Sequence, residues 1–198
     1  TPIGEVERAI GRHVAALVPD GATVQVGVGA IPQAVLEALG SHRDLSMHSL
    51  LVDAAVDLVE RGVVTRARKR LHRGRMDLGA ALGTRRLFDF DHENPLVNME
   101  PTGYVHDPGM GGGRASRSRG GAAIIALPST GRDGAVSRIV PALQPGAAVT
   151  NPRALADWVV TEQGAAELRG KGERGRAEAL TAVAHPRFRE ELLRHATS

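Results

Sequence analysis

Short apolar stretches that switch between the period of a strand and the period of a helix most constrain the fold of this chain. Residues 22–30, ATVQVGVGA, alternate like a β-strand and then run into glycines. The next stretch, IPQAVLEALG, starts near a proline that suits a first helical turn and ends on a glycine that suits a helix terminus, which predicts a helix over 31–39. Strand, glycine loop and helix thus follow one another directly.

The same alternation continues along the chain. Three- and four-residue apolar spacings predict a helix over 3–17. Further strands are predicted at 45–52, 76–82, 95–101, 122–129, 136–141 and 157–162, and further helices at 54–62, 164–169, 174–184 and 186–196. Strands interspersed with helices predict an α/β fold with a largely parallel sheet flanked by helices. We expect a single domain over 1–198, with PGMGGGRASRSRGG (108–121) as a flexible glycine and arginine loop.

Composition excludes several classes of protein. Hydrophobic residues make up 42% and charged residues 24% of the chain, the balance of a soluble globular protein, and no apolar run is long enough to cross a membrane. The N-terminus does not read as a secretory signal, so a cytoplasmic location is expected. There is no cysteine and no zinc-ligand spacing, so no metal is expected. Arginine clusters could hold phosphate or be solvated surface, but aromatic residues are too few to favour nucleic acid as a partner.

Candidate site residues are glycines, one histidine and two acidic residues. Gly27 and Gly29 lie between a predicted strand and a predicted helix, where backbone N–H groups can approach an oxyanion, although tight turns also use glycine for steric reasons. His48 lies five residues before Asp53 and is either half of an acid–base pair or a partly buried structural histidine. The glycine cluster that includes Gly109, Gly111 and Gly112 could wrap a nucleotide or thioester, or be a linker. His13, His72, His185 and His195 are expected to need no special role.

Several stretches together resemble a known family. They are GATVQVGVGAIPQAVLEAL (21–39), VDLVERGVVTRARKRLHRGR (56–75), ALGTRRLFDFDHENPLVNMEP with YVHDP (81–108), RGGAAIIALPST (119–130), SRIVPALQPGAAVTNPR (137–153), and VVTEQGAAELRGK with AHPRFREEL (159–192). These stretches resemble the acetyl-CoA hydrolase and 4-hydroxybutyrate CoA-transferase family, and they correspond to the C-terminal half of a member. The resemblance implies a CoA-transferase-like C-terminal domain and coenzyme A or an acyl-CoA as substrate.

The chain departs from the family at two places. Members use a glutamate that becomes a glutamyl-CoA thioester, and it stands in a stretch of the form His-Ser/Thr-Glu-Met before an aspartate. Here His48 and Ser49 are followed by Leu50, Leu51, Val52 and Asp53, which is one residue short, and the missing residue is the glutamate. Members also carry, after the Asp-Pro that matches Asp107 and Pro108, a segment ending in a Gly-Val-Gly-Gly-Gln loop. Here Gly109, Met110, Gly111 and Gly112 resemble Gly-Val-Gly-Gly, and Gly113 stands in place of the glutamine.

Two classes of function remain. The first is an enzyme that handles an acyl thioester or a related carbonyl substrate without a glutamyl-CoA intermediate, with acid–base chemistry from water, His48, Asp53 or Glu162 and an oxyanion site at the Gly27–Gly29 loop. The alternative is a non-catalytic subunit or binding module that pairs with a partner protein or an acyl carrier. Because the resemblance implies a lobe that packs against another lobe, we expect a homodimer or a partner subunit.

Overall fold

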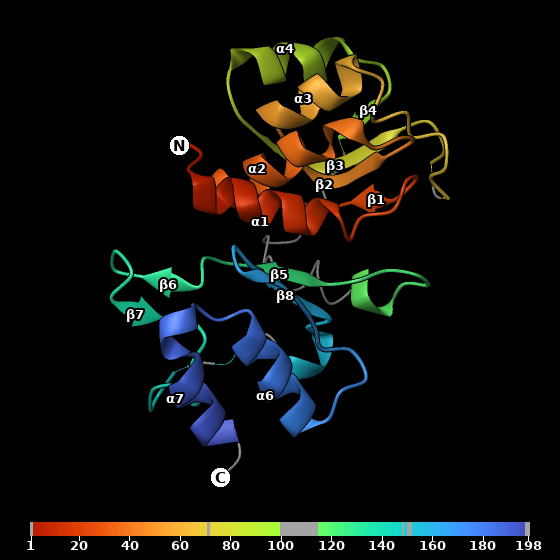
Figure 1. Ribbon diagram of the computed structural model, residues 1–198. Coiled ribbons are helices and arrows are strands. Elements are labelled where there is room, and N and C mark those ends of the chain that lie inside the picture. Colours follow the sequence, from red (N-terminus) through yellow and green to blue (C-terminus); the bar gives the residue numbers. More distant parts are fainter. Residues whose placement is uncertain (1, 71, 100–114, 148, 150–151, 197–198) are drawn as a thin grey trace. The chain divides into compact units, whose positions relative to one another are not determined.

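The computed structural model of the chain describes residues 2–70, 72–99, 115–147, 149 and 152–196. These residues form two compact units (Figure 1). The first comprises Thr1–Ile3 and Ala15–Val105, and the second comprises Gly4–Val14 and His106–Ser198. Each unit is made from two separate stretches of the chain, so the boundary between the units is crossed more than once.

The first unit is built on a four-stranded parallel sheet. Its strands lie in the order β1 (Thr23–Val24), β2 (Ser46–Val52), β3 (Met76–Leu82) and β4 (Val97–Met99). The connections contain α2 (Ala30–Ala38) with the 3-10 turn η1 (Leu39–Ser41), α3 (Asp53–Glu60) and α4 (Arg85–Glu93). These helices pack in a row, α2 on α3 and α3 on α4, and Figure 1 shows them stacked beside the strands.

Apolar side chains from strands and helices fill the core of this unit. Met47 and Leu51 of β2 and Met76 and Leu78 of β3 are buried. The helices add the fully buried or nearly buried side chains Leu36, Val56, Leu58 and Leu87. This core fixes the parallel strands, and with them the edge at which their carboxyl ends meet.

The second unit has a smaller, mixed sheet. Strand β5 (Ile124–Ala126) pairs in parallel with β8 (Trp158–Thr161), and β8 pairs antiparallel with β9 (Gly164–Glu167). A separate two-stranded ladder joins β6 (Thr130–Gly131) to β7 (Val136–Ser137), and the 3-10 turn η2 (Arg153–Leu155) precedes β8. Helices α6 (Glu173–Ala182) and α7 (Pro186–Ala196) complete the unit around a core of Val159, Ala166, Leu168 and Val183.

Nearly all of the first helix, α1 (Glu5–Ala15), belongs to the second unit. The ring of His13 forms a hydrogen bond through Nδ1 with the carbonyl oxygen of Thr161, at 3.0 Å. On the same helix Ile10 and Val14 are buried. The N-terminal helix is therefore a structural part of a unit whose other residues come from the second half of the chain.

The predicted fold class, α/β with a parallel sheet flanked by helices, is confirmed. The helix predicted over 164–169 is wrong, because Gly164–Glu167 forms β9. Gly164 has φ +142°, which L side chains rarely adopt, and the Gln163 N–H donates to Thr161 Oγ1 at 3.0 Å. A tight hairpin therefore turns the chain back on β8 where the apolar spacing alone suggested a helix.

Two further expectations are corrected in detail. The strand predicted in 22–30 is limited to Thr23–Val24, and the residues that follow form the loop before α2. Helix α4 and strand β6 had no counterpart in the sequence-based prediction. Within the described part of the chain, no helix has the length and apolar character that crossing a membrane requires.

Candidate functional site

The glycine loop follows β1 at the carboxyl edge of the parallel sheet. Thr23 and Val24 pair with Ser46 and Met47, so the loop over residues 25–29 leaves the sheet next to the point where β2 continues into His48. In open parallel sheets this edge is where ligands bind. In the first turn of α2, Pro32 has no N–H and the Gln33 N–H donates to the carbonyl oxygen of Gly29 at 3.1 Å. The N–H groups of Ala30 and Ile31 have no acceptor within the helix, which makes them available to an oxyanion.

The two glycines of this loop differ in what they require. Gly29 precedes α2 with φ 115° and ψ −174°, a conformation open essentially to glycine alone. A Cβ atom built on Gly29 meets nothing within 4 Å, so the space in front of it is open. A Cβ on Gly27 would lie 3.8 Å from Pro32 Cγ, an ordinary contact. The backbone therefore demands glycine at position 29, whereas a small side chain fits at position 27.

His48 lies on β2 with an exposed side chain. Its partner in the register of the parallel pair β2 and β3 is Asp77. Neighbouring strands are about 4.8 Å apart, and residues paired in register point to the same face of the sheet. The structure thus sets an aspartate beside His48, although it is not the one that the sequence suggested.

Asp53, the predicted partner of His48, is engaged elsewhere. Its carboxylate accepts the N–H of Thr84 at 2.9 Å and the hydroxyl of Thr84 at 2.6 Å. A Cβ on Gly83 would lie 2.5 Å from Asp53 Oδ2, so glycine allows this close approach. Asp53 therefore joins the start of α3 to the residue before α4, and an acid–base role for it stays a prediction.

Glu162 lies in the second unit, between β8 and β9. Its carboxylate accepts the N–H of Ser129 at 2.8 Å and also the Ser129 hydroxyl. Partial burial of Glu162 acts to raise its pKa, but the hydrogen bonds from the hydroxyl and N–H of Ser129 outweigh burial, and the pKa is lowered. A carboxylate with a lowered pKa stays ionised and is a weak base, so the catalytic role predicted for Glu162 has no support from its electrostatics.

The glycine cluster predicted after Pro108 lies outside the described residues. Gly109, Gly111 and Gly112 fall in the stretch 100–114, of which the structure describes nothing. A contribution of these residues to binding a thioester stays a prediction.

A register shift interrupts the pairing of β2 with β3. Ser49 pairs with Leu78 but Leu50 pairs with Ala80, so Gly79 of β3 has no counterpart in β2. Ser49 has φ +79°, which is uncommon for a residue other than glycine. Gly79 of β3 is therefore the extra residue of a β-bulge opposite Ser49 and Leu50, at the place where the sequence predicts a missing residue in β2.

A charged cluster that sequence reasoning missed lies next to His48. Asp77 is buried in β3, where it accepts a hydrogen bond from Lys69 Nζ and contacts His72 Nδ1 at 2.7 Å. Lys69 is buried too. The signal that could have found the cluster is the aspartate itself, because an acidic residue within the apolar strand MDLGAAL needs a partner.

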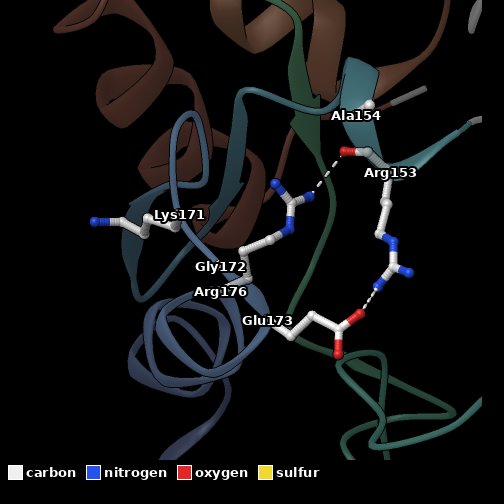
Figure 2. Close-up of a pocket in the computed structure, with 6 residues that line it drawn as sticks. All are labelled: Arg153, Ala154, Lys171, Gly172, Glu173 and Arg176. Atoms are coloured by element: carbon white, nitrogen blue, oxygen red, sulfur yellow. Dashed lines mark hydrogen bonds and ion pairs between the residues drawn. The ribbon is translucent and has the colours of Figure 1, made fainter.

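A hollow of about 320 Å³ in the second unit is rich in cations but lacks the features of a ligand site (Figure 2). Arg153 donates to Glu173 at 2.6 Å, and Arg176 donates to the carbonyl oxygens of Arg153 and Leu168, each at 2.9 Å. Figure 2 shows Lys171 directed away from these side chains. Both guanidinium groups thus hold η2 against the start of α6. Among the described residues no group of three metal-ligating side chains gathers.

In sequence and in fold this chain is similar to CoA transferases. Residues 112–196 match the family model described as the Acetyl-CoA hydrolase/transferase C-terminal domain. The chain is 40% identical to the 4-hydroxybutyrate coenzyme A transferase of Clostridium kluyveri, covering 96% of the chain and 54% of that protein. It is also 40% identical to the succinyl-CoA:cyclohexane-1-carboxylate CoA transferase of Geobacter metallireducens, covering 96% and 53%.

Solved structures agree with the sequence relatives. RipA from Yersinia pestis superposes with a TM-score of 0.90 at 35% identity, covering 100% of this chain and 53% of that one. The 4-hydroxybutyrate CoA-transferase from Porphyromonas gingivalis gives a TM-score of 0.88 at 36% identity, covering 99% and 56%. The resemblance to the acetyl-CoA hydrolase and 4-hydroxybutyrate CoA-transferase family is thereby confirmed for this chain.

The chain spans about half the length of the curated relatives it matches. The aligned region of the Clostridium kluyveri protein runs over 232 residues, more than the 198 residues of this chain. Residues of the relative within that region therefore have no counterpart here. A segment lacking after Pro108 stays a prediction.

Proposed function

We propose that this chain acts on an acyl-CoA thioester, or a related carbonyl substrate, without forming a glutamyl-CoA intermediate. The relatives named above are CoA transferases, which supports coenzyme A thioesters as the substrate class. The register shift after Ser49 is the observation that supports the absence of a glutamyl-CoA intermediate. A strand that is one residue short at the motif has no position for the attacking carboxylate. A CoA thioester substrate also fits the cytoplasmic location expected from the sequence.

Water replaces the carboxylate as nucleophile in this proposal. The backbone N–H groups of Gly29, Ala30 and Ile31 polarise the thioester carbonyl and stabilise the negative charge that develops on its oxygen. The water oxygen bonds to the carbonyl carbon, the carbon–sulfur bond breaks, and the sulfur leaves as a thiolate. His48 is the acid–base residue that gives a proton to the sulfur. The products are a carboxylic acid and free CoA.

Mass spectrometry of the chain after incubation with acetyl-CoA or butyryl-CoA tests the proposal. We expect release of free CoA, and no borohydride-reducible adduct on any glutamate. His48→Gln should lower kcat about 100-fold, while His92→Gln, which changes a solvent-exposed histidine of α4, should not. A CoA adduct on a glutamate would refute the absence of the intermediate. A chain that releases no CoA from either thioester would refute the enzymatic function.

A non-catalytic role with a partner is supported by a different observation. Val140, Leu143 and Val149 of the second unit expose 48%, 59% and 67% of their surface, and exposed apolar side chains on one stretch of chain are typical of a covered surface. In this alternative the chain pairs with a second copy, a partner subunit or an acyl carrier protein. Light scattering at high micromolar concentration separates the possibilities, because a strict monomer that also fails to bind acyl carrier protein contradicts this role.

A further inference from the structure

The carboxylate of Asp77 organises a compact cluster at the start of β3. Asp77 is 7% exposed and its two oxygens have different partners: Oδ2 accepts from Lys69 Nζ, and Oδ1 contacts His72 Nδ1 at 2.7 Å. Lys69 is also 7% exposed and donates to the carbonyl oxygen of Arg75 at 3.1 Å. The ion pair with Lys69 thus holds the Asp77 carboxylate in the interior, while the His72 imidazole lies toward the surface.

This contact determines which nitrogen of His72 carries the proton. An ionised carboxylate only accepts hydrogen bonds, so Nδ1 of the neutral ring must be the donor. Nε2 then carries a lone pair. The His72 side chain is 54% exposed, so this nitrogen is on a ring that solvent and small molecules can reach. An imidazole held in one tautomer by a carboxylate, with the opposite nitrogen accessible, is the arrangement of a general base.

Lys69 is the counter-ion of the buried Asp77 carboxylate. A buried carboxylate without a counter-ion takes up a proton or draws the nearest cation to itself. Because Lys69 already supplies the positive charge, the carboxylate of Asp77 can hold the His72 ring as a hydrogen-bond acceptor.

We propose that His72 is the general base of the thioester chemistry and that Asp77 is its positioning residue, an inference that rests on the proposed function. His72 Nε2 takes a proton from the water as its oxygen bonds to the carbonyl carbon. His48, the register partner of Asp77 on β2, gives a proton to the sulfur as the carbon–sulfur bond breaks. His72 then releases its proton to solvent and His48 regains one. Sequence patterns predicted no role for His72, and its contact with Asp77 is visible only in the structure.

Kinetics with acetyl-CoA and butyryl-CoA test the role of His72. His72→Gln keeps a donor for Asp77 and should fold, yet kcat should fall about 100-fold with little change in KM. His72→Ala should lose the same activity and recover part of it when imidazole is added, because free imidazole can replace the missing base. His92→Gln serves as the matched control with unchanged kinetics. Full activity of His72→Gln would refute the assignment.

A second measurement does not depend on turnover. In nitrogen-15 NMR spectra, neutral His72 should show the proton on Nδ1, the opposite of the tautomer that free imidazole side chains prefer in water. The double variant Lys69→Met with Asp77→Leu replaces the buried pair by apolar residues, which folds tolerate well; it should remain folded, lose this tautomer and lose activity. A proton on Nε2 in the wild-type chain would refute the positioning by Asp77. If the wild-type chain turns over no thioester, the proposed function fails and the catalytic role of His72 with it, whereas turnover that survives in His72→Gln refutes this inference alone.

Discussion

Replacing Asp157 by asparagine should lower the stability of the fold by an amount that depends on pH. Asp157 is 3% exposed and accepts hydrogen bonds from Arg169 Nε and Nη2, each at 2.8 Å, and from the N–H of Ala123, also at 2.8 Å. The bonds from Arg169 lower the pKa of Asp157 to about 2, although burial acts in the opposite direction and Ala123 adds to the lowering. The ordinary value is 3.8, so the folded chain holds this group ionised at a pH where the unfolded chain protonates it.

The magnitude and its sign follow from linkage. One pKa unit corresponds to about 1.4 kcal/mol, so the shift is equivalent to about 2 kcal/mol of stability. The side chain of Arg169 is 48% exposed, and solvent screening reduces this to about 1–2 kcal/mol. Because the folded-state pKa is depressed, the contribution is complete above the unfolded value. It is lost as pH falls from about 4 to about 2.

Urea unfolding followed by tryptophan fluorescence measures this contribution. Trp158, the single tryptophan of the chain, is the first residue of β8 and follows Asp157 directly, so its fluorescence reports on the second unit. We expect Asp157→Asn to be less stable than wild type by about 1–2 kcal/mol at pH 7, with a difference that shrinks toward pH 2. Glu173→Gln, which breaks an ion pair between side chains that are 75% and 81% exposed, should change stability by less than about 0.5 kcal/mol. A difference for Asp157→Asn that is equal at pH 7 and pH 2.5 would contradict the reasoning.

Two further predictions concern the first unit. Gly29→Ala should destabilise the fold by about 1–3 kcal/mol even though nothing obstructs the new side chain, because essentially only glycine adopts that backbone conformation. In thermal melts the control Gly27→Ala should stay near wild type, and equal losses of stability at both positions would contradict this. Inserting glutamate directly after Ser49 should supply the missing partner of Gly79 and leave the stability in urea unchanged or higher. The same insertion before Met47 should be strongly destabilising, because it moves the following side chains of β2 to the opposite face of the sheet. Similar losses from both insertions would show that the strand is not one residue short.

The order of strands and helices was predictable because it depends on local patterns. The strand over 76–82 was predicted with the bounds that the structure has, since glycines and charged residues delimit one apolar run. Helix α7 was predicted with its bounds for the same kind of reason, as Pro186 suits a first helical turn. The region over 164–169 failed because four residues of apolar spacing fit a strand as well as a helix, and only the hairpin with Gly164 decides between them.

The partners of individual side chains were not predictable, because they depend on register and on loops. The spacing of His48 and Asp53 suggested a pair, but Asp53 bonds to Thr84, which is 31 residues away along the chain. Asp77 becomes the neighbour of His48 only through the pairing of two parallel strands, which no local pattern encodes. The sequence did indicate where β2 lacks a residue, because a motif of fixed length makes a missing position countable.

Helix α1 has a consequence for how the second unit folds. His13 of α1 and its partner Thr161 are 148 residues apart in the sequence, so this contact forms only after the residues of the parallel sheet between them have been synthesised. Contacts of such long sequence separation slow folding. The strands and helices of residues 115–196 therefore do not complete the core of the second unit without α1.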